Sequence, residues 1–231
     1  MQKSMKWMAA YAVTILAALI SVYLGSRTVT AAAERIPLPR KYCIVIDPGH
    51  GGIDGGAVSC TGKLEKFYNL QFALRFRDLM HLLGYQTKMT RVSDESIYIK
   101  GETIAEKKLS DLKERVKKVN EADGGILVSF HQNQFSDSRY FGPQVFYASA
   151  KGSKELAFHV QNNLKTRLTP ITGRKAKPSA GVYLMQHIKN PGILIECGFL
   201  SNPQEEARLS DPRYQKKFCC VAAASVAQFL G

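Results

Sequence analysis

Short apolar runs recur along the chain after residue 41, and polar or turn-forming residues separate them. The runs are compact and rich in β-branched or aromatic residues, which predicts buried strands rather than segments of helix. On this basis strands are expected at 42–47 (YCIVID), 85–91 (YQTKMTR), 125–130 (GILVSF), 144–149 (QVFYAS) and 192–197 (GILIEC).

Between these runs, apolar residues repeat every three or four positions, as they do on one face of a helix. Helices are predicted at 65–83, 102–122 and 153–168, and from Asp211 to the C-terminus. Strands that alternate with helices of this length predict an α/β fold. We expect a single-domain three-layer sandwich, with a mostly parallel central sheet flanked by helices.

The helix predicted at 102–122 is strongly charged. Its apolar residues Leu109, Leu112, Val116 and Val119 follow each other at three- and four-residue intervals. This spacing predicts that they form the core face of the helix, and that its many lysines lie in solvent.

The N-terminus has a different pattern. Lys3 and Lys6 precede a stretch of 20 residues without charge, which ends at Arg27 and is followed by small residues. Residues 1–33 are therefore expected to be a signal peptide or a membrane anchor, and residues 34–231 the folded domain. The basic flank predicts that this domain is extracytoplasmic, either secreted to the wall or held at the membrane facing outside.

Composition narrows the possible partners and sites. The net charge of +13 favours polyanionic surroundings such as anionic lipid or an acidic wall, although it could simply keep the protein soluble. Export argues against a nucleic-acid partner. The five cysteines are odd in number, and no C-x-x-C pair occurs, so neither a disulfide framework nor a cysteine zinc site is expected.

Four side chains have the chemistry of a hydrolytic metal site. His50, His131 and Glu196 lie at or just beyond the ends of predicted strands, where sites gather in open α/β sheets, and Glu65 opens a predicted helix. Two histidines and one carboxylate are a common ligand set for catalytic zinc and leave one position for water. A further glutamate can then act as the general base.

Taken singly, each of these residues also has a purely structural interpretation. A histidine after a strand is often a buried imidazole with satisfied hydrogen bonds, and Glu65 could serve only as an acid at a helix N-terminus. Glu196 is harder to explain in this way, because a carboxylate at the end of a core strand is costly to bury unless it is paired or functional.

Residues around these four could support the site. Asp47 and Asp54 are close enough in sequence to hydrogen-bond the ligand imidazoles, and an equally good interpretation gives them turn-forming roles. Arg91 and Arg115 are expected to form structural ion pairs.

At this point a family resemblance becomes clear. The segments IDPGHGGIDGGA, LEKFYNL, ERVKKVNEAD, VSFHQN and PGILIECGFLSNP resemble, in order, the signature blocks of the zinc-dependent N-acetylmuramoyl-L-alanine amidases of the amidase-3 family. The resemblance covers residues 42 to about 228, so residues 34–231 would form the catalytic amidase domain. It implies that His50, Glu65 and His131 hold Zn²⁺, and that Glu196 is the catalytic glutamate.

The resemblance also implies a substrate and a setting. The reaction would cleave the amide between N-acetylmuramic acid and L-alanine in peptidoglycan. The short layout is similar to that of sporulation amidases that prepare spore cortex for muramic-lactam formation, which would place the protein in the forespore intermembrane space. Wall turnover is the other setting. The N-terminal segment would contact the membrane if it is not cleaved, and an activating protein partner is possible but unknown.

Two residues depart from the family pattern, and two alternative functions are considered. Gln132 and Cys197 stand where the family commonly has other residues, and they are expected to alter the pocket wall. The alternative functions are a non-catalytic peptidoglycan-binding domain stabilised by zinc, and a zinc peptidase that cuts within the stem peptide.

Overall fold

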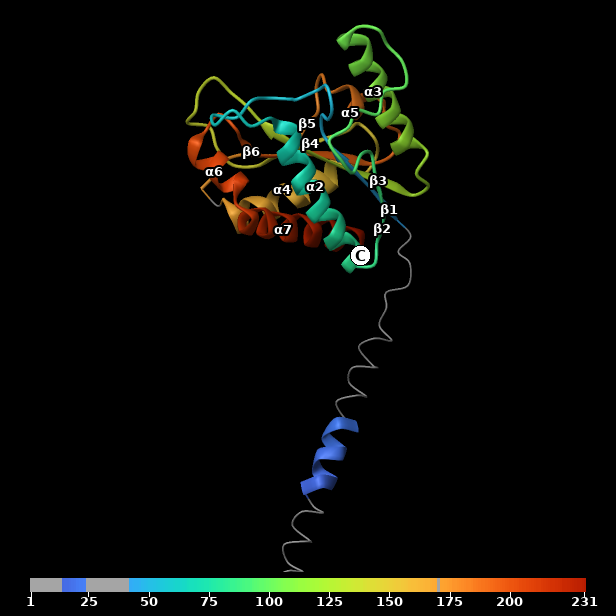
Figure 1. The fold of residues 1–231 in the computed structure, drawn as a ribbon, viewed down its shortest axis with the longest axis vertical. Coiled ribbons are helices and arrows are strands. Elements are labelled where there is room, and N and C mark those ends of the chain that lie inside the picture. Colours follow the sequence, from blue (N-terminus) through green and yellow to red (C-terminus); the bar gives the residue numbers. More distant parts are fainter. Residues whose placement is uncertain (1–13, 24–41, 170) are drawn as a thin grey trace, which may run out of the picture. The chain divides into compact units, whose positions relative to one another are not determined.

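The structure is a computed structural model that describes residues 14–23, 42–169 and 171–231 (Figure 1). The chain divides into two units, Met1–Leu38 and Pro39–Gly231. In the first unit, residues 14–23 form an exposed helix, and the rest of the predicted segment 1–33 lies outside the described residues. No helix within the described ranges combines the length and the apolar character needed to cross a membrane.

The second unit is built on a sheet of six strands in the order β2-β1-β3-β6-β4-β5. All neighbouring strands are parallel except β4 and β6, which are antiparallel. The mostly parallel α/β sheet predicted from the sequence is therefore confirmed. The strands are β1 (Cys43–Pro48), β2 (Gln86–Met89), β3 (Gly125–Asn133), β4 (Gln144–Tyr147), β5 (Lys177–Pro178) and β6 (Gly192–Phe199).

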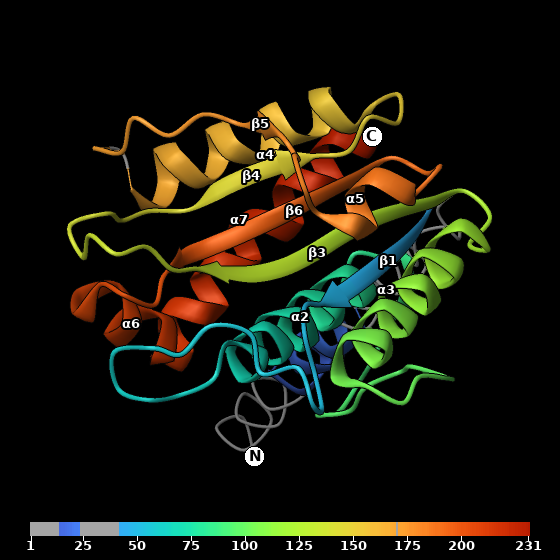
Figure 2. The same ribbon diagram turned by 90° about the horizontal axis from the view of Figure 1, so that it is seen from above.

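Helices cover both faces of the sheet, with α2, α4 and α7 on one face and α3 and α5 on the other (Figure 2). The helices are α2 (Glu65–Leu82), α3 (Ile104–Asn120), α4 (Ser153–Leu168), α5 (Tyr183–His187), α6 (Pro203–Ser210) and α7 (Pro212–Leu230). The three predicted layers are present. The short helix α5 and the two-residue strand β5 were not predicted, since neither is long enough to show a period.

Alternation along the strands divides the core into two parts. On β6, Ile193 and Ile195 pack under α2, α4 and α7, whereas Leu194 packs under α3 and α5. Successive strand residues point to opposite faces, so Glu196 shares the α3 and α5 face with Leu194. By the same parity, His131 of β3 shares that face with Leu127. His131 and Glu196 thus lie on one face, at the C-terminal ends of their strands.

The prediction for α3 was partly wrong. Val119 is buried as expected, but Leu109 is 42% exposed, and Ser110 and Arg115 are buried instead. The helix is rotated so that it directs polar side chains toward the sheet, because buried acceptors and a carboxylate there satisfy the Arg115 guanidinium. Apolar spacing alone could not reveal this orientation.

Candidate metal centre

The loop after β1 carries the first histidine in a constrained backbone. Among the described residues, His50 is the one non-glycine residue with positive φ, at 62°. Such a conformation is costly for an L-residue and persists only where the surroundings enforce it. The main-chain carbonyl of His50 accepts hydrogen bonds from Arg91 Nε at 2.7 Å and from Arg115 Nη2 at 2.7 Å. The two arginines therefore hold the loop in place.

The two arginines do this in different ways. Arg115 forms the expected ion pair, with Nη1 2.6 Å from Asp47 Oδ1. For Arg91 the expectation was wrong, because within the described chain its guanidinium donates to main-chain carbonyls and not to a carboxylate. The acceptors are the carbonyls of Pro48, Gly49, His50, Lys66 and Ser93. Arg91 thus satisfies main-chain acceptors of the His50 loop and of the neighbouring segments at once.

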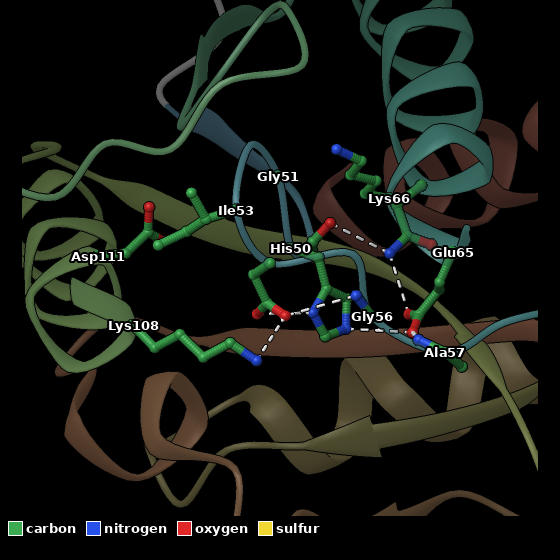
Figure 3. Close-up of polar contacts among 12 residues, drawn as sticks. His50, Gly51, Ile53, Gly56, Ala57, Glu65, Lys66, Lys108 and Asp111 are labelled. Carbon is green, nitrogen blue, oxygen red and sulfur yellow. Dashed lines mark hydrogen bonds and ion pairs between the residues drawn. The ribbon is translucent and has the colours of Figure 1, made fainter. Parts of the chain in front are cut away.

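Glu65, at the start of α2, brings the two imidazoles together. His50 Nε2 lies 3.1 Å from Glu65 Oε2, and His131 Nδ1 lies 3.0 Å from Glu65 Oε1. Figure 3 shows His50 and Glu65 facing each other across this site. One ligand atom from each of the three residues lies within 4.8 Å of the others. Two ligands on one tetrahedral zinc lie roughly 3.4 Å apart, so the three side chains are close enough to share an ion.

Hydrogen bonds from the surrounding chain fix the Glu65 carboxylate. Oε1 accepts from the Gln132 backbone N–H and from Asn69 Nδ2, both at 3.0 Å, and Oε2 accepts from the Ala57 backbone N–H at 3.0 Å. Burial alone would raise the pKa of Glu65, but hydrogen bonds and charge from His131 and His50 outweigh it and lower that pKa. Glu65 is therefore a carboxylate, as a metal ligand requires.

Asp54 orients the His50 ring from the other side. Its Oδ2 accepts from His50 Nδ1 at 2.9 Å, and its Oδ1 lies 2.8 Å from Lys108 Nζ on α3 (Figure 3). Burial lowers the pKa of His50, but the hydrogen bonds to Asp54 and Glu65 more than reverse this and raise it to about 9. The predicted contact between Asp54 and a ligand imidazole is confirmed. It leaves Nε2 of His50 free to face Glu65, as in many metal sites.

Two glycines make room for this group. A Cβ on Gly49 would lie 2.1 Å from His131 Nε2, and a Cβ on Gly56 would lie 2.6 Å from Glu65 Oε2 and 2.7 Å from His50 Cδ2. The donor set and this space both fit a zinc ion, which prefers imidazole and carboxylate ligands.

A Gly49→Ala variant is expected to lose most of its metal affinity. The new methyl group would displace the His131 ring, and Gly49 does not have positive φ, so backbone strain adds little. Zinc affinity should fall by at least about 10-fold, the effect typical of misplaced ligands. Competition with a chromophoric chelator would measure it. Gly173→Ala, which meets no heavy atom within 4 Å and does not have positive φ, controls for the added methyl group. Unchanged affinity would show that the ring position does not matter.

Glu196 lies beside this group without belonging to it. β3 and β6 are in register, so that His131 is paired with Glu196 across the two strands. The Oε2 atom of Glu196 is buried and has no hydrogen-bond partner among the residues that the structure describes. Burial raises the pKa of Glu196 to about 7, and the charge of His131 opposes this shift. A carboxylate poised to exchange a proton near neutral pH suits general acid–base chemistry.

Asp47 does not contact a ligand imidazole, contrary to one expectation. It accepts hydrogen bonds from Thr90 Oγ1, Arg115 Nη1 and Ser129 Oγ, at 2.6–2.7 Å. Burial would raise the pKa of Asp47, but Arg115 and the two hydroxyls lower it from 3.8 to about 2. Asp47 therefore anchors Arg115, which in turn holds the His50 carbonyl.

This pairing predicts how stability depends on pH. Because the folded pKa of Asp47 lies below its unfolded value, its contribution is complete above pH 4 and is lost as pH falls toward 2. The contribution amounts to about 2 kcal/mol of the free energy of unfolding. In urea titrations at a series of pH values, Asp47→Asn should flatten the dependence between pH 4 and 2. Asp78→Asn, at an exposed ion pair, should retain the wild-type slope, and equal slopes in all three proteins would contradict the assignment.

Neither of the two departures from the family pattern lines the cavity beside the metal group. Gln132 is buried and donates its backbone N–H to Glu65, and Cys197 packs in the core under α7 with Cys219. The expectation that they alter the pocket wall is therefore wrong for both. All five cysteines are free thiols.

That cavity has a volume of about 310 Å³. His50, His131 and Asp54 form one side of it, α3 contributes another, and residues 181–184 close it. Its α3 wall includes Lys107, Lys108, Asp111 and Leu112. Sequence reasoning placed these lysines in solvent. Lys107, Asp111 and Arg115 follow each other at i, i+4 and i+8. This spacing could have predicted that these three side chains lie on one face of the helix.

Comparison with known proteins agrees with this geometry. The family model described as N-acetylmuramoyl-L-alanine amidase, amidase-3, matches residues 44–228. A germination-specific N-acetylmuramoyl-L-alanine amidase of Bacillus subtilis (strain 168) is 39% identical over 220 residues, which cover 94% of this chain and 91% of that relative. The amidase LytC of the same strain is 30% identical over 177 residues, which cover 75% of this chain and 32% of LytC.

Solved structures show the same fold. The CwlD amidase from Clostridioides difficile, in complex with the GerS lipoprotein, superposes with a TM-score of 0.78 at 36% identity, covering 82% of this chain and 98% of that one. The amidase AmiC2 of Nostoc punctiforme has a TM-score of 0.70 at 26% identity, covering 84% and 99%. Because the family model spans most of the folded domain and the germination-specific relative aligns along most of its length, the chain belongs to the amidase-3 family of N-acetylmuramoyl-L-alanine amidases.

Proposed function

We propose that this chain is a zinc-dependent amidase that cleaves peptidoglycan between the lactyl group of N-acetylmuramic acid and L-alanine. One observation carries the proposal. Glu196 has an unpartnered carboxylate oxygen among the described residues, and it is paired in register with a histidine of the group His50, Glu65 and His131. A metal-ligand group with an adjacent free acid is the arrangement that hydrolysis of an unactivated amide needs.

The site residues would have two roles, metal binding and proton transfer. His50, Glu65 and His131 would hold the zinc, which when bound polarises the amide carbonyl and acidifies a water molecule. Glu196 takes a proton as the water oxygen adds to the carbonyl carbon. It then delivers that proton to the amide nitrogen as the C–N bond breaks. The products are the lactyl carboxylate and a stem peptide with a free L-alanine amine.

We also propose a role in the spore cortex, which the germination-specific relative supports. The lactyl group freed by the cleavage would then be used for muramic-lactam formation. We place the protein outside the cytoplasm, with residues 1–33 as its signal or anchor. Because the solved CwlD structure contains a lipoprotein, we also propose that a protein partner assists this chain.

The test is product analysis. The purified zinc-loaded protein should release whole stems that begin with L-alanine and leave the glycan intact, as read by mass spectrometry. A chelator should stop the release, and added zinc should restore it. Cuts within the stem would instead identify a peptidase, and glycan binding without new amine ends would identify a binding domain.

A further inference from the structure

We propose that Lys107 binds a carboxylate of the substrate's stem peptide, and that the cavity between α3 and α5 is the subsite for that peptide. This inference rests on the proposed amidase function and names the part of the substrate that enters the cavity. It assigns a specificity role to a side chain outside the metal group.

The cavity and the metal group are continuous. His50 and His131 line the same 310 Å³ space as Lys107, so a molecule whose amide lies at the imidazoles extends directly toward α3. The remaining walls are largely apolar, with Leu112 on α3, Leu184 on α5 and Leu194 on β6. Such a pocket, with a few polar groups among apolar walls, is typical of small-ligand sites.

The charged groups around the cavity are paired, with one exception in the described part of the chain. Arg115 lies between Asp47 and Asp111, with contacts of 2.6 and 2.5 Å, and Lys108 binds Asp54 at 2.8 Å. Lys107 has no carboxylate partner among the described residues. Its ammonium lies 5.6 Å from the centre of the Tyr98 ring, which also lines the cavity. Lys107 is therefore a cation that faces the cavity and is available to an anionic ligand.

The chemistry of the substrate favours the peptide over the glycan as the occupant. In the bond to be cleaved, the lactyl carboxyl is already an amide, so the glycan at this point carries no charge. The stem peptide does carry free carboxylates. A carboxylate on its second residue lies at most ~7 Å from the scissile nitrogen, since a residue spans no more than ~3.6 Å. The 310 Å³ volume suits a short peptide better than a glycan strand.

A pair of substrates that differ in one group tests the assignment. Both are disaccharide units with the same stem, and the carboxyl of the second stem residue is either free or amidated. A lysine–carboxylate hydrogen bond in a partly enclosed site should make the full-length zinc-loaded protein prefer the free acid by about 10-fold or more in kcat/KM. Lys107→Met should reduce that preference to within about 2-fold by slowing cleavage of the free acid, and Lys107→Arg should retain it.

The controls separate this inference from the function on which it rests. Lys113→Met removes an exposed charge from the same helix and should leave the preference unchanged. Equal cleavage of both substrates by the wild type, or an equal loss on both with Lys107→Met, would overturn the subsite while the amidase function stands. If the wild type cleaves neither substrate, the proposed function fails and this inference fails with it.

Discussion

Replacing Glu196 by Gln is expected to lower kcat by about 10²–10⁴-fold while zinc stays bound. The carboxylate oxygen Oε2 has no partner to lose among the described residues, and the amide has nearly the same shape, so the fold should change little. What disappears is the group that accepts a proton from water and returns it to the leaving nitrogen. Steady-state kinetics on a defined muropeptide, together with zinc content, would measure both effects.

A second buried glutamate provides the matched control. Glu205 is also buried, but it accepts a hydrogen bond from the Gly142 backbone N–H at 2.7 Å and lies outside the metal group. Glu205→Gln should therefore reduce stability more than kcat. A near-normal kcat in Glu196→Gln would place the general base elsewhere.

Replacing Glu65 by Gln is expected to reduce zinc affinity by more than about 100-fold and to abolish turnover with it. The neutral amide removes the negative charge between the two imidazoles. In the wild type both carboxylate oxygens of Glu65 accept hydrogen bonds, from Ala57, Asn69 and Gln132. The NH₂ group of the variant would therefore place a donor against one of these donors. Affinity measured by competition with a chelator gives a readout that does not depend on activity.

Asp94→Asn is the control for this second change. Asp94 accepts from the Gly52 backbone N–H and pairs with Lys66 close to the same loop, but it is not a member of the metal group. It should keep zinc affinity near the wild-type value. If Glu65→Gln bound zinc as tightly as Asp94→Asn, Glu65 would not be a ligand.

The sequence-based prediction succeeded where the information is local. Apolar runs identified β1, β3 and β6, and the period of 153–168 matches α4 (Ser153–Leu168). Asn202-Pro203 is a typical helix start, and Asn202 Oδ1 does accept from the Gln204 backbone N–H at the beginning of α6. Because the carboxyl ends of parallel strands meet at one sheet edge, the strand pattern alone was enough to expect His131 and Glu196 close together.

The prediction failed where a side chain finds its partner far away in the chain. Arg91 was expected in an ion pair and binds carbonyls of the His50 loop, about 40 residues upstream. Asp47 binds Arg115, 68 residues away, and not an imidazole. Lys107 was assigned to solvent and lines the cavity. A long flexible side chain can reach many partners, and its choice depends on the rotation of helices that pattern alone does not specify.

The sequence by itself determined five of the six strands, most of the helices, the edge of the sheet and the four residues of the candidate site. These follow from the period of apolar residues and from where polar residues interrupt it. Only the tertiary structure decided the orientation of α3, the arginine contacts that hold His50 at positive φ, and the cation left facing the cavity. Such features depend on which buried donor meets which buried acceptor, and that pairing is settled only when the helices pack against the sheet.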